Sequence, residues 1–305
     1  MSQVNSYTNT VGRFTDVRDK LFMIEGTGTI YQDMCKLSKA ANNSHTWVEE
    51  KYSTGTSNTS QRLDGADLSG DTPPTRTGFD NQVEANAQTA EVTDGMIAIA
   101  KNGGEAGVKD YKSKAIADAL VELKANIERS LLNGTKSAAD GTHLGKMQGL
   151  VPMAASFGVT AYSSDTSWTT TAEGTFRTML QGIRTAGGLR TVKKIALMSY
   201  VTKDLISLGF KGNNATVTAL AENGTIYTDV GIYSTQFGPL ALMGSDAMVD
   251  GKVVVFEKAY ANIAVLQPTQ RKPLATTGLA WKESYTNYST QAYEMPSTLG
   301  HMIAS

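Results

Sequence analysis

Apolar residues recur at every third or fourth position in residues 108–132, VKDYKSKAIADALVELKANIERSLL. They are Ile116, Leu120, Leu123, Ile127 and Leu131. Because this spacing places them on one helical face, the segment is predicted to be a long amphipathic helix. We expect the Asn133-Gly134 pair that follows to end the helix with a residue in the left-handed conformation.

The segment before this helix, residues 51–82, is long and almost entirely polar. Its large apolar side chains are Tyr52, Leu63, Leu68 and Phe79. Structureless loops beyond about 15 residues are uncommon in compact domains, so such a segment is either disordered or held by another chain. The next run, residues 81–93, has strand-like spacing but is polar on both faces, and a ribbon of this kind gains too little burial to stand alone. The two runs therefore predict an arm that needs a neighbouring molecule.

The remaining elements predicted from the pattern are shorter and belong to the α+β class. Residues 30–40 form a short element of ambiguous type, and Trp168 is the expected anchor of the Gly-, Ser- and Thr-rich residues 135–173. Helices are predicted at residues 15–25, 176–185 (ending at Gly187-Gly188) and 201–210. Strands are predicted at residues 45–52, 192–200, 252–256 and 263–266, and residues 278–294 are predicted to form a strand pair or one bent strand. Hairpin turns are expected at Asn223-Gly224 and Asp250-Gly251.

Composition limits the classes of protein that the chain can belong to. Its 305 residues can form one large domain or two smaller ones, and a formal net charge of -1 gives no overall field toward nucleic acid or acidic membranes. The single cysteine, Cys35, excludes an internal disulfide framework and is expected to be a small buried hydrophobe. No apolar run approaches the roughly 20 residues needed to cross a bilayer, and the polar N-terminus predicts no secretory signal.

The sequence contains no motif that predicts catalysis, a cofactor or a metal. The histidines have no metal-type spacing and are interpreted as surface or loop residues; they are His45, His143 and His301. Residues 26–31 begin like a dinucleotide-binding loop but lack its third glycine, and residues 141–147 lack the spacing of a phosphate-binding loop. The sequence after Ser245 lacks the second glycine of a nucleophile elbow. The pair Glu49-Glu50 is interpreted as a solvated strand end. The aromatic residues interpreted as sheet packing are Tyr285, Tyr288 and Tyr293.

Three lysines crowd the start of the predicted long helix: Lys109, Lys112 and Lys114. The helix dipole prefers anions there by about 0.3–1 kcal/mol per group, and Asp110 offsets only part of the repulsion. Two interpretations stay open. The lysines are either solvated surface residues or contacts for an acidic partner, which would be a neighbouring subunit or nucleic acid.

Taken in order, several segments resemble a known family of proteins. They are FTDVRDKLFMIEG, HTWVEE, DNQVEANAQTAEVTDG, KSKAIADALVELKANIERSLLNG, KKIALMSYVTKDLISLGF and the run from GPLALMGSD through PLATTGLAWKESYTNYSTQAYEM. The chain resembles the major capsid proteins of tailed double-stranded DNA phages, which have the Hong Kong 97-type fold. Because the recognisable body begins by about Val11, the resemblance is to the branch without an N-terminal scaffolding region.

The resemblance implies an α+β fold with a defined layout. Residues 1–44 would be the N-terminal arm, and residues 45–105 an extended β-hairpin loop that lies over the adjacent subunit. Residues 106–173 and 251–305 would form the peripheral domain, with residues 108–132 as its spine helix. The axial domain would comprise residues 174–250, whose loops meet at the centre of each pentamer or hexamer.

The function implied is that of a structural subunit, not an enzyme, with no cofactor and no metal. It would self-assemble into the icosahedral head of a tailed phage in the host cytoplasm and enclose double-stranded DNA without sequence-specific binding. Further expected partners are the portal and a separate scaffolding or decoration protein, with no membrane. The predicted intersubunit contacts are Arg62, Asp64, Asp67, Glu84, Lys109, Lys112 and Lys114. The alternatives are a phage tail, decoration or adhesin-like binding module and a soluble enzyme without a readable motif.

Overall fold

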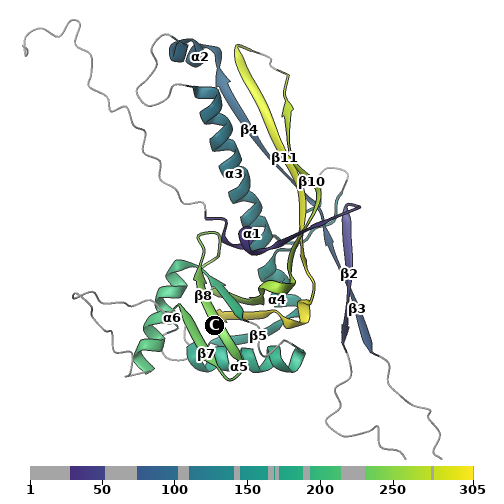
Figure 1. The fold of residues 1–305 in the computed structure, drawn as a ribbon, viewed down its shortest axis with the longest axis vertical. Coiled ribbons are helices and arrows are strands. Elements are labelled where there is room, and N and C mark those ends of the chain that lie inside the picture. The colour runs from purple at the N-terminus through teal and green to yellow at the C-terminus, as the bar shows by residue number, and fades with distance from the viewer. Residues whose placement is uncertain are drawn as a thin grey trace, which may run out of the picture.

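Helices and strands alternate irregularly along the chain, as the α+β prediction expects. The computed structural model describes residues 28–51, 74–101, 110–140, 145–163, 168, 172–187, 193–213, 231–275 and 278–304. Figure 1 shows an elongated upper part beside one long helix, a lower part built on a sheet with helices, and a two-stranded hairpin at one side. The helix expected at residues 15–25 and the turn expected at Asn223-Gly224 lie outside the described residues.

The described strands form two sheets and one two-stranded ribbon. The four-stranded sheet has the order β1 (Lys36–Lys39), β10 (Ala261–Pro273), β11 (Ala280–Tyr293) and β4 (Glu84–Thr93). The six-stranded sheet has the order β5 (Val159–Ser163), β12 (Gly300–Ala304), β9 (Lys252–Glu257), β6 (Lys194–Met198), β8 (Gly238–Gly244) and β7 (Ile232–Thr235). The ribbon consists of β2 (Ser44–Lys51) and β3 (Thr75–Gln82).

The helices differ greatly in length. They are α1 (Ile30–Met34), α2 (Asp94–Lys101), α3 (Tyr111–Asn133), α4 (Leu150–Phe157), α5 (Ala172–Ala186) and α6 (Tyr200–Asn213), with the short turns η2 (Lys258–Tyr260) and η3 (Pro296–Thr298). The helices predicted at residues 176–185 and 201–210 are confirmed as α5 and α6. Helix α4, strand β12 and the hairpin between β7 and β8 have no counterpart among the predicted elements.

Helix α3 is the predicted long amphipathic helix, and its apolar face is confirmed. Its first turn is capped by the side chain of Asp110, which accepts a hydrogen bond from the backbone amide of Lys112 at 3.0 Å. Leu123, Ile127 and Leu131 are buried on the face that packs against α4 and the four-stranded sheet. This burial, rather than helix propensity, provides most of the stability of such a helix.

The predicted left-handed end of α3 is wrong. Gly134 has φ -56° and ψ 135°, which any residue can adopt. The glycine is needed for a different reason, because its carbonyl oxygen accepts the amide of Gly149 at 2.7 Å. A Cβ atom on Gly134 would lie 2.5 Å from the carbonyl oxygen of Ser130 and 2.7 Å from that of Met147. The residue after α3 therefore serves a close backbone approach.

The prediction that residues 81–93 lack a partner in their own chain is also wrong. Strand β4 pairs antiparallel with β11 along its whole length, from Glu84 opposite Ser289 to Thr93 opposite Ala280. The alternate residues Ala90 and Val92 of β4 are buried, and the strand contacts α3. The polar composition of β4 thus reflects a strand of which only one face is covered.

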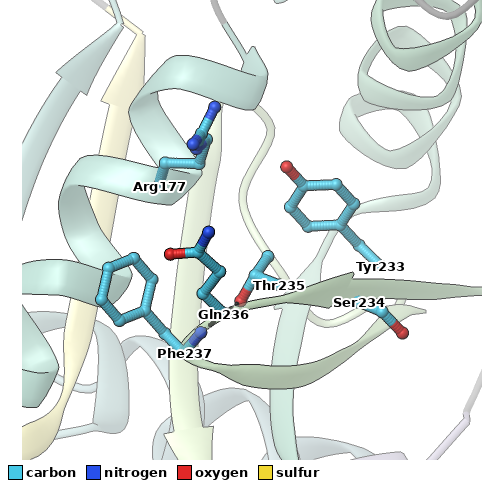
Figure 2. Close-up of a pocket in the computed structure, with 6 residues that line it drawn as sticks. All are labelled: Arg177, Tyr233, Ser234, Thr235, Gln236 and Phe237. Carbon is cyan, nitrogen blue, oxygen red and sulfur yellow. Dashed lines mark hydrogen bonds between the residues drawn. The ribbon is translucent and has the colours of Figure 1, made fainter.

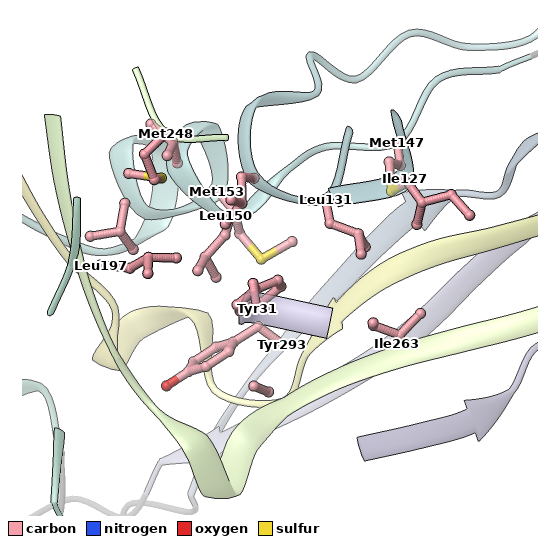
Figure 3. Packing of buried hydrophobic residues seen from close by; sticks show 14 of the residues in the cluster. Tyr31, Ile127, Leu131, Met147, Leu150, Met153, Leu197, Met248, Ile263 and Tyr293 are labelled. Atoms are coloured by element: carbon pink, nitrogen blue, oxygen red, sulfur yellow. The ribbon is translucent and has the colours of Figure 1, made fainter. Parts of the chain in front are cut away.

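Strand β9 separates two hydrophobic cores because its successive side chains point to opposite sides of the six-stranded sheet. Val254 and Phe256 belong to the larger core, which α1, α3 and α4 also line. Figure 3 shows Tyr31 and Tyr293 within this core, close to Leu150 and Met153. On the other face, Val253 and Val255 pack with residues of α5 and α6, including Phe176 and Phe210. The predicted anchor Trp168 is fully buried in this second core.

One further expectation differs from the structure. Asp250-Gly251 forms a turn with Gly251 at φ 75°, but not a hairpin, because β6 lies between β8 and β9 in the sheet. The expected axial domain, residues 174–250, contains β6, β8 and β7. Strands β5, β9 and β12, which the predicted layout assigns to the peripheral domain, complete the same six-stranded sheet.

Candidate subunit interface at the β2–β3 hairpin

The β2–β3 hairpin has one face toward its own body and one face toward solvent. Its register runs from Ser44 opposite Gln82 to Lys51 opposite Thr75. Because successive side chains of a strand alternate, His45, Trp47 and Glu49 share the less exposed face. The strand predicted at residues 45–52 is thereby confirmed for the described residues.

The base of the hairpin is held by Asn81, whose side chain is fully buried. Its Oδ1 accepts hydrogen bonds from the backbone amides of Gln148 at 2.7 Å and Gln82 at 2.9 Å. Its Nδ2 donates to the carbonyl oxygens of Gln148 at 2.9 Å and Gln291 at 2.8 Å. The amide therefore uses both of its donors and both acceptor positions, which fixes the end of β3 firmly in the body.

A row of rings connects the hairpin to the end of α4. The ring of Trp47 lies 5.9 Å from that of His45 and 6.1 Å from that of Phe79. Phe79 in turn meets Phe157 edge to face at 5.1 Å. Aromatic pairs at these distances contribute about 0.5–1.5 kcal/mol beyond the area they bury. This row determines on which side of the body the hairpin lies.

Farther along β2, the side chain of Glu49 contacts the turn η3. It is only 7% exposed. Its carboxylate accepts two hydrogen bonds from Ser297. One comes from the hydroxyl group and the other, at 3.3 Å, from the backbone amide. The interpretation of Glu49 as a solvated strand end is therefore wrong, whereas its neighbour Glu50 is exposed and pairs with Arg76 at 2.8 Å.

The outer face of the hairpin is open. Val48 is 64% exposed there. In the described part of the chain, neither outer edge of the ribbon pairs with a third strand. Unpaired edges and an exposed apolar side chain are features of a surface that another chain can cover.

The predicted intersubunit contacts that the structure describes already have partners within the chain. Glu84 accepts hydrogen bonds from the hydroxyl of Ser130 at 3.0 Å and from the amide of Met147 at 3.1 Å. Lys112 lies 5.5 Å above the centre of the Trp281 ring, and Lys114 pairs with Asp118 at 2.8 Å. Arg62, Asp64, Asp67 and Lys109 lie outside the described residues. An intersubunit role for any of these residues stays a prediction.

Two groups that are often reactive, the buried His301 ring and the partly buried Cys35 thiol, are held in their neutral forms. His301 is 2% exposed, so its interpretation as a surface histidine is wrong. Burial, with a smaller effect of Lys252, lowers the pKa of His301 to about 4. Burial raises the pKa of the Cys35 thiol to about 12, which keeps the nucleophilic thiolate from forming near neutral pH. His143 lies outside the described residues.

A small cavity of about 170 Å³ lies between α5 and the β7–β8 hairpin. Figure 2 shows Arg177 on one side of it and Tyr233 and Gln236 on the other. The hydroxyl of Tyr233 donates to Glu173 at 3.0 Å, and burial together with this carboxylate raises the pKa of Tyr233 to about 12. The cavity brings one cation together with a protonated phenol and supplies no activated nucleophile.

The described residues contain no group of three or more histidine, cysteine, aspartate or glutamate side chains that could hold a metal ion. None of their helices is long and apolar enough to cross a membrane.

An extended polar hairpin, a long helix beside a four-stranded sheet and a second sheet with helices together match one class of known protein. A profile of the family described as SU10 major capsid protein matches residues 3–302. The chain belongs to this family. A search of curated proteins found no match.

Solved structures with a similar fold come from phages and from a GTA particle. The subunit is similar to a chain of the cyanophage A-1(L) capsid asymmetric unit, with a TM-score of 0.66 and 14% identity over 98% of this chain and 99% of that one. It is also similar to a chain from Mycobacterium phage Bobi, with a TM-score of 0.62 and 12% identity over 100% of this chain and 99% of that one. A chain of the native GTA particle capsid is similar with a TM-score of 0.60 and 10% identity, over 99% of this chain and 100% of that one. At these identities the likeness establishes the fold.

The family and the fold confirm the expected major capsid protein with a Hong Kong 97-type fold. Such a subunit assembles with copies of itself into the icosahedral head shell of a tailed phage and is part of the virion. The alternative of a tail, decoration or adhesin-like module is therefore wrong.

The sequence-based reasoning missed the residues that hold the hairpin. A signal existed for Glu49, because alternation along HTWVEEK puts it on the same face as His45 and Trp47. No local signal exists for Asn81, whose partners Gln148 and Gln291 are far away in the sequence.

Proposed function

We propose that the β2–β3 hairpin is the arm by which each capsid subunit holds a neighbour in the shell. The observation that carries this proposal is the open outer face of the hairpin, with Val48 64% exposed. A two-stranded ribbon is only marginally stable by itself in water. A neighbouring subunit lying across the ribbon would bury Val48 and cover the unpaired edges.

The proposed layout differs from the one expected from the sequence in two places. The extended loop ends near residue 82 rather than residue 105, because β4 is a strand of the four-stranded sheet beside α3. The axial region includes β5, β9 and β12 in addition to residues 174–250, because these strands share one sheet. Residues 1–44 remain the N-terminal arm, and the axial regions meet at the centres of pentamers and hexamers.

The shell encloses double-stranded DNA without sequence-specific binding. A formal net charge of -1 supports this part of the proposal, because a subunit without a strong positive field does not hold DNA tightly. The portal and a separate scaffolding or decoration protein are the further partners. Assembly takes place in the host cytoplasm, away from membranes, and the subunit performs no catalysis.

Shortening the arm tests the proposal. Residues 53–73 are replaced by a short Gly-Ser linker, which leaves β2, β3 and the Glu49 contact in place. We expect a cooperative melt like that of the unaltered protein, because the described core is untouched. Assembly into shells, followed by light scattering and negative-stain microscopy, should fail. Normal shells from the shortened subunit would contradict the proposal for the part of the arm beyond β2 and β3.

A point variant tests the outer face by itself. Val48→Asp places a charge on the exposed side of β2, and we expect it to block assembly with a change in unfolding free energy below about 0.5 kcal/mol. The matched control, Val48→Thr, keeps a β-branched side chain without charge and should still assemble. Equal assembly by both variants would mean that this face does not contact a neighbour.

A further inference from the structure

A row of buried hydrogen bonds joins four elements that are far apart in the sequence. We call it the polar relay and define it as Asn81, Gln291, Tyr31 and Glu128. These residues lie at the end of β3, in β11, in α1 and in α3. All four are fully buried in the subunit.

The first connection of the relay lies between the hairpin and the four-stranded sheet. The Nδ2 of Asn81 donates to the carbonyl oxygen of Gln291 at 2.8 Å. At Gln291, strand β11 pairs with β10, opposite Ile263, whereas its pairing with β4 ends two residues earlier, at Ser289. The position of the Gln291 backbone therefore determines where the end of β3 lies.

The second connection lies between Gln291 and α1. The Nε2 of Gln291 donates to the hydroxyl oxygen of Tyr31. The Oε1 of the same side chain is buried and has no hydrogen-bond partner among the described residues. The Tyr31 hydroxyl is thus the one described group that holds the Gln291 amide, and without it both ends of a buried amide would be unpaired. Such a side chain is expected to reorient rather than remain in place.

The third connection holds α1 on the long helix. The carboxylate of Glu128 accepts the backbone amides of Tyr31 at 2.7 Å and Gln32 at 3.0 Å. Figure 3 shows the Tyr31 ring in the core near Tyr293. The Tyr31 ring also meets the ring of Phe256 edge to face, with 5.4 Å between the ring centres. The hydroxyl group at the far end of this fixed ring is therefore well positioned to hold Gln291.

We propose that the polar relay couples the orientation of the β2–β3 hairpin to the docking of α1 on α3. When α1 is docked, Tyr31 holds Gln291, and the Gln291 carbonyl oxygen holds Asn81 at the hairpin base. When α1 leaves α3, the buried Gln291 side chain loses its hydrogen-bond partner and reorients, which displaces the backbone of β11 at Gln291 and weakens the hydrogen bond that Asn81 donates to its carbonyl oxygen. The inference concerns contacts within one chain, so it does not depend on the proposed contact between subunits.

Hydrogen–deuterium exchange tests the coupling from the side of α1. Tyr31→Phe removes the hydroxyl of the relay and leaves the ring in the core. We expect amide exchange in residues 44–51 and 75–82 to become at least about threefold faster. Tyr285→Phe is the matched control, because it removes another buried tyrosine hydroxyl, which donates to Glu283 at 3.0 Å outside the relay. Exchange in the hairpin should be unchanged in the control.

Thiol labelling tests the coupling from the side of the hairpin. Cys35 is the one cysteine of the chain, and it directly follows α1, so its reaction with a maleimide reports the undocking of α1. Asn81→Ser should speed this reaction at least about threefold. Asn86→Ser, in β4 and outside the relay, is the matched control and should leave the rate unchanged.

The two experiments together can overturn the proposal. If Tyr31→Phe speeds exchange in residues 28–39 but not in the hairpin, the contacts at Tyr31 are only local. If Asn81→Ser loosens the hairpin while Cys35 labels at the original rate, the coupling is not reciprocal, as an equilibrium coupling must be. Should Asn81→Ser fail to fold, the Tyr31→Phe result alone decides.

Discussion

Ser297 donates two hydrogen bonds to the carboxylate of Glu49, although the two residues are 248 positions apart in the sequence. Glu49 lies near the middle of β2, and Ser297 lies in the turn η3 just before β12. The contact therefore joins the hairpin to the six-stranded sheet at a point well beyond the base of the hairpin.

Loss of the Glu49 carboxylate should weaken this contact. We expect Glu49→Gln to reduce the free energy of unfolding by about 1–3 kcal/mol, because the amide cannot accept both hydrogen bonds and leaves a partly buried donor unpaired. Chemical denaturation of unassembled subunits measures the loss. The control Glu50→Gln alters an exposed ion pair and should change stability by less than about 0.5 kcal/mol. Equal losses would show that the burial of Glu49 is unimportant.

The apolar face of α3 allows a sharp comparison between neighbouring residues. Leu123 is buried, whereas Lys124 is exposed. Leu123→Ala should destabilise the subunit by about 2–5 kcal/mol because it opens a cavity in the larger core. Lys124→Ala should change the free energy of unfolding by less than about 0.5 kcal/mol. Similar losses in thermal or chemical melts would contradict the orientation of the helix.

Gly149 should be intolerant of any side chain. A Cβ atom there would lie 2.6 Å from the amide nitrogen of Gly134 and 2.7 Å from the carbonyl carbon of Leu132. Gly149→Ala should therefore cost more than about 2 kcal/mol, since backbone atoms cannot move aside cheaply. Gly174→Ala, in α5 with no atom within 4 Å of its Cβ, should instead stabilise the subunit by up to about 1 kcal/mol. A tolerated Gly149→Ala in denaturation experiments would refute the close approach.

His301 should make stability depend on pH. Its pKa in the folded chain is about 4, below the ordinary value of 6.5, so between these values the unfolded chain binds the proton and the folded chain does not. The contribution of the neutral His301 to the free energy of unfolding is complete above pH 6.5 and is lost as the pH falls toward 4. The loss attributable to His301 is at most about 3 kcal/mol.

Substitution separates this effect from the titration of carboxylates. His301→Leu has a similar volume and no proton to bind, so the difference in unfolding free energy between wild type and variant should change with pH between about 6.5 and 4. A difference that is constant across this range would show that His301 is not neutral and buried.

The parts of the fold that the sequence predicts are those with a local pattern. Leu123, Ile127 and Leu131 recur at helical spacing, and residues 195–198 of β6 are a continuous apolar run, so both elements could be recognised without knowledge of their partners. The polar residues 84–93 looked unpartnered because β11 follows them only near the end of the chain. Local periodicity carries no information on such pairing.

The same reasoning explains the errors at individual residues. Gly134 follows a helix, as left-handed glycines often do, but its role depends on the approach of Gly149, which no local pattern reveals. His301 is interpreted from the sequence as a surface or loop residue because it lies near the C-terminus and has no partner at metal-type spacing. The structure buries it between β5 and β9 in the middle of a sheet.

An electron cryo-microscopy reconstruction of assembled particles tests the central claim most directly. We expect an icosahedral shell in which the hairpin of each subunit, residues 44–82, lies across the adjacent subunit with Val48 buried in the contact. A shell in which Val48 faces solvent and the hairpin contacts only its own chain would contradict it.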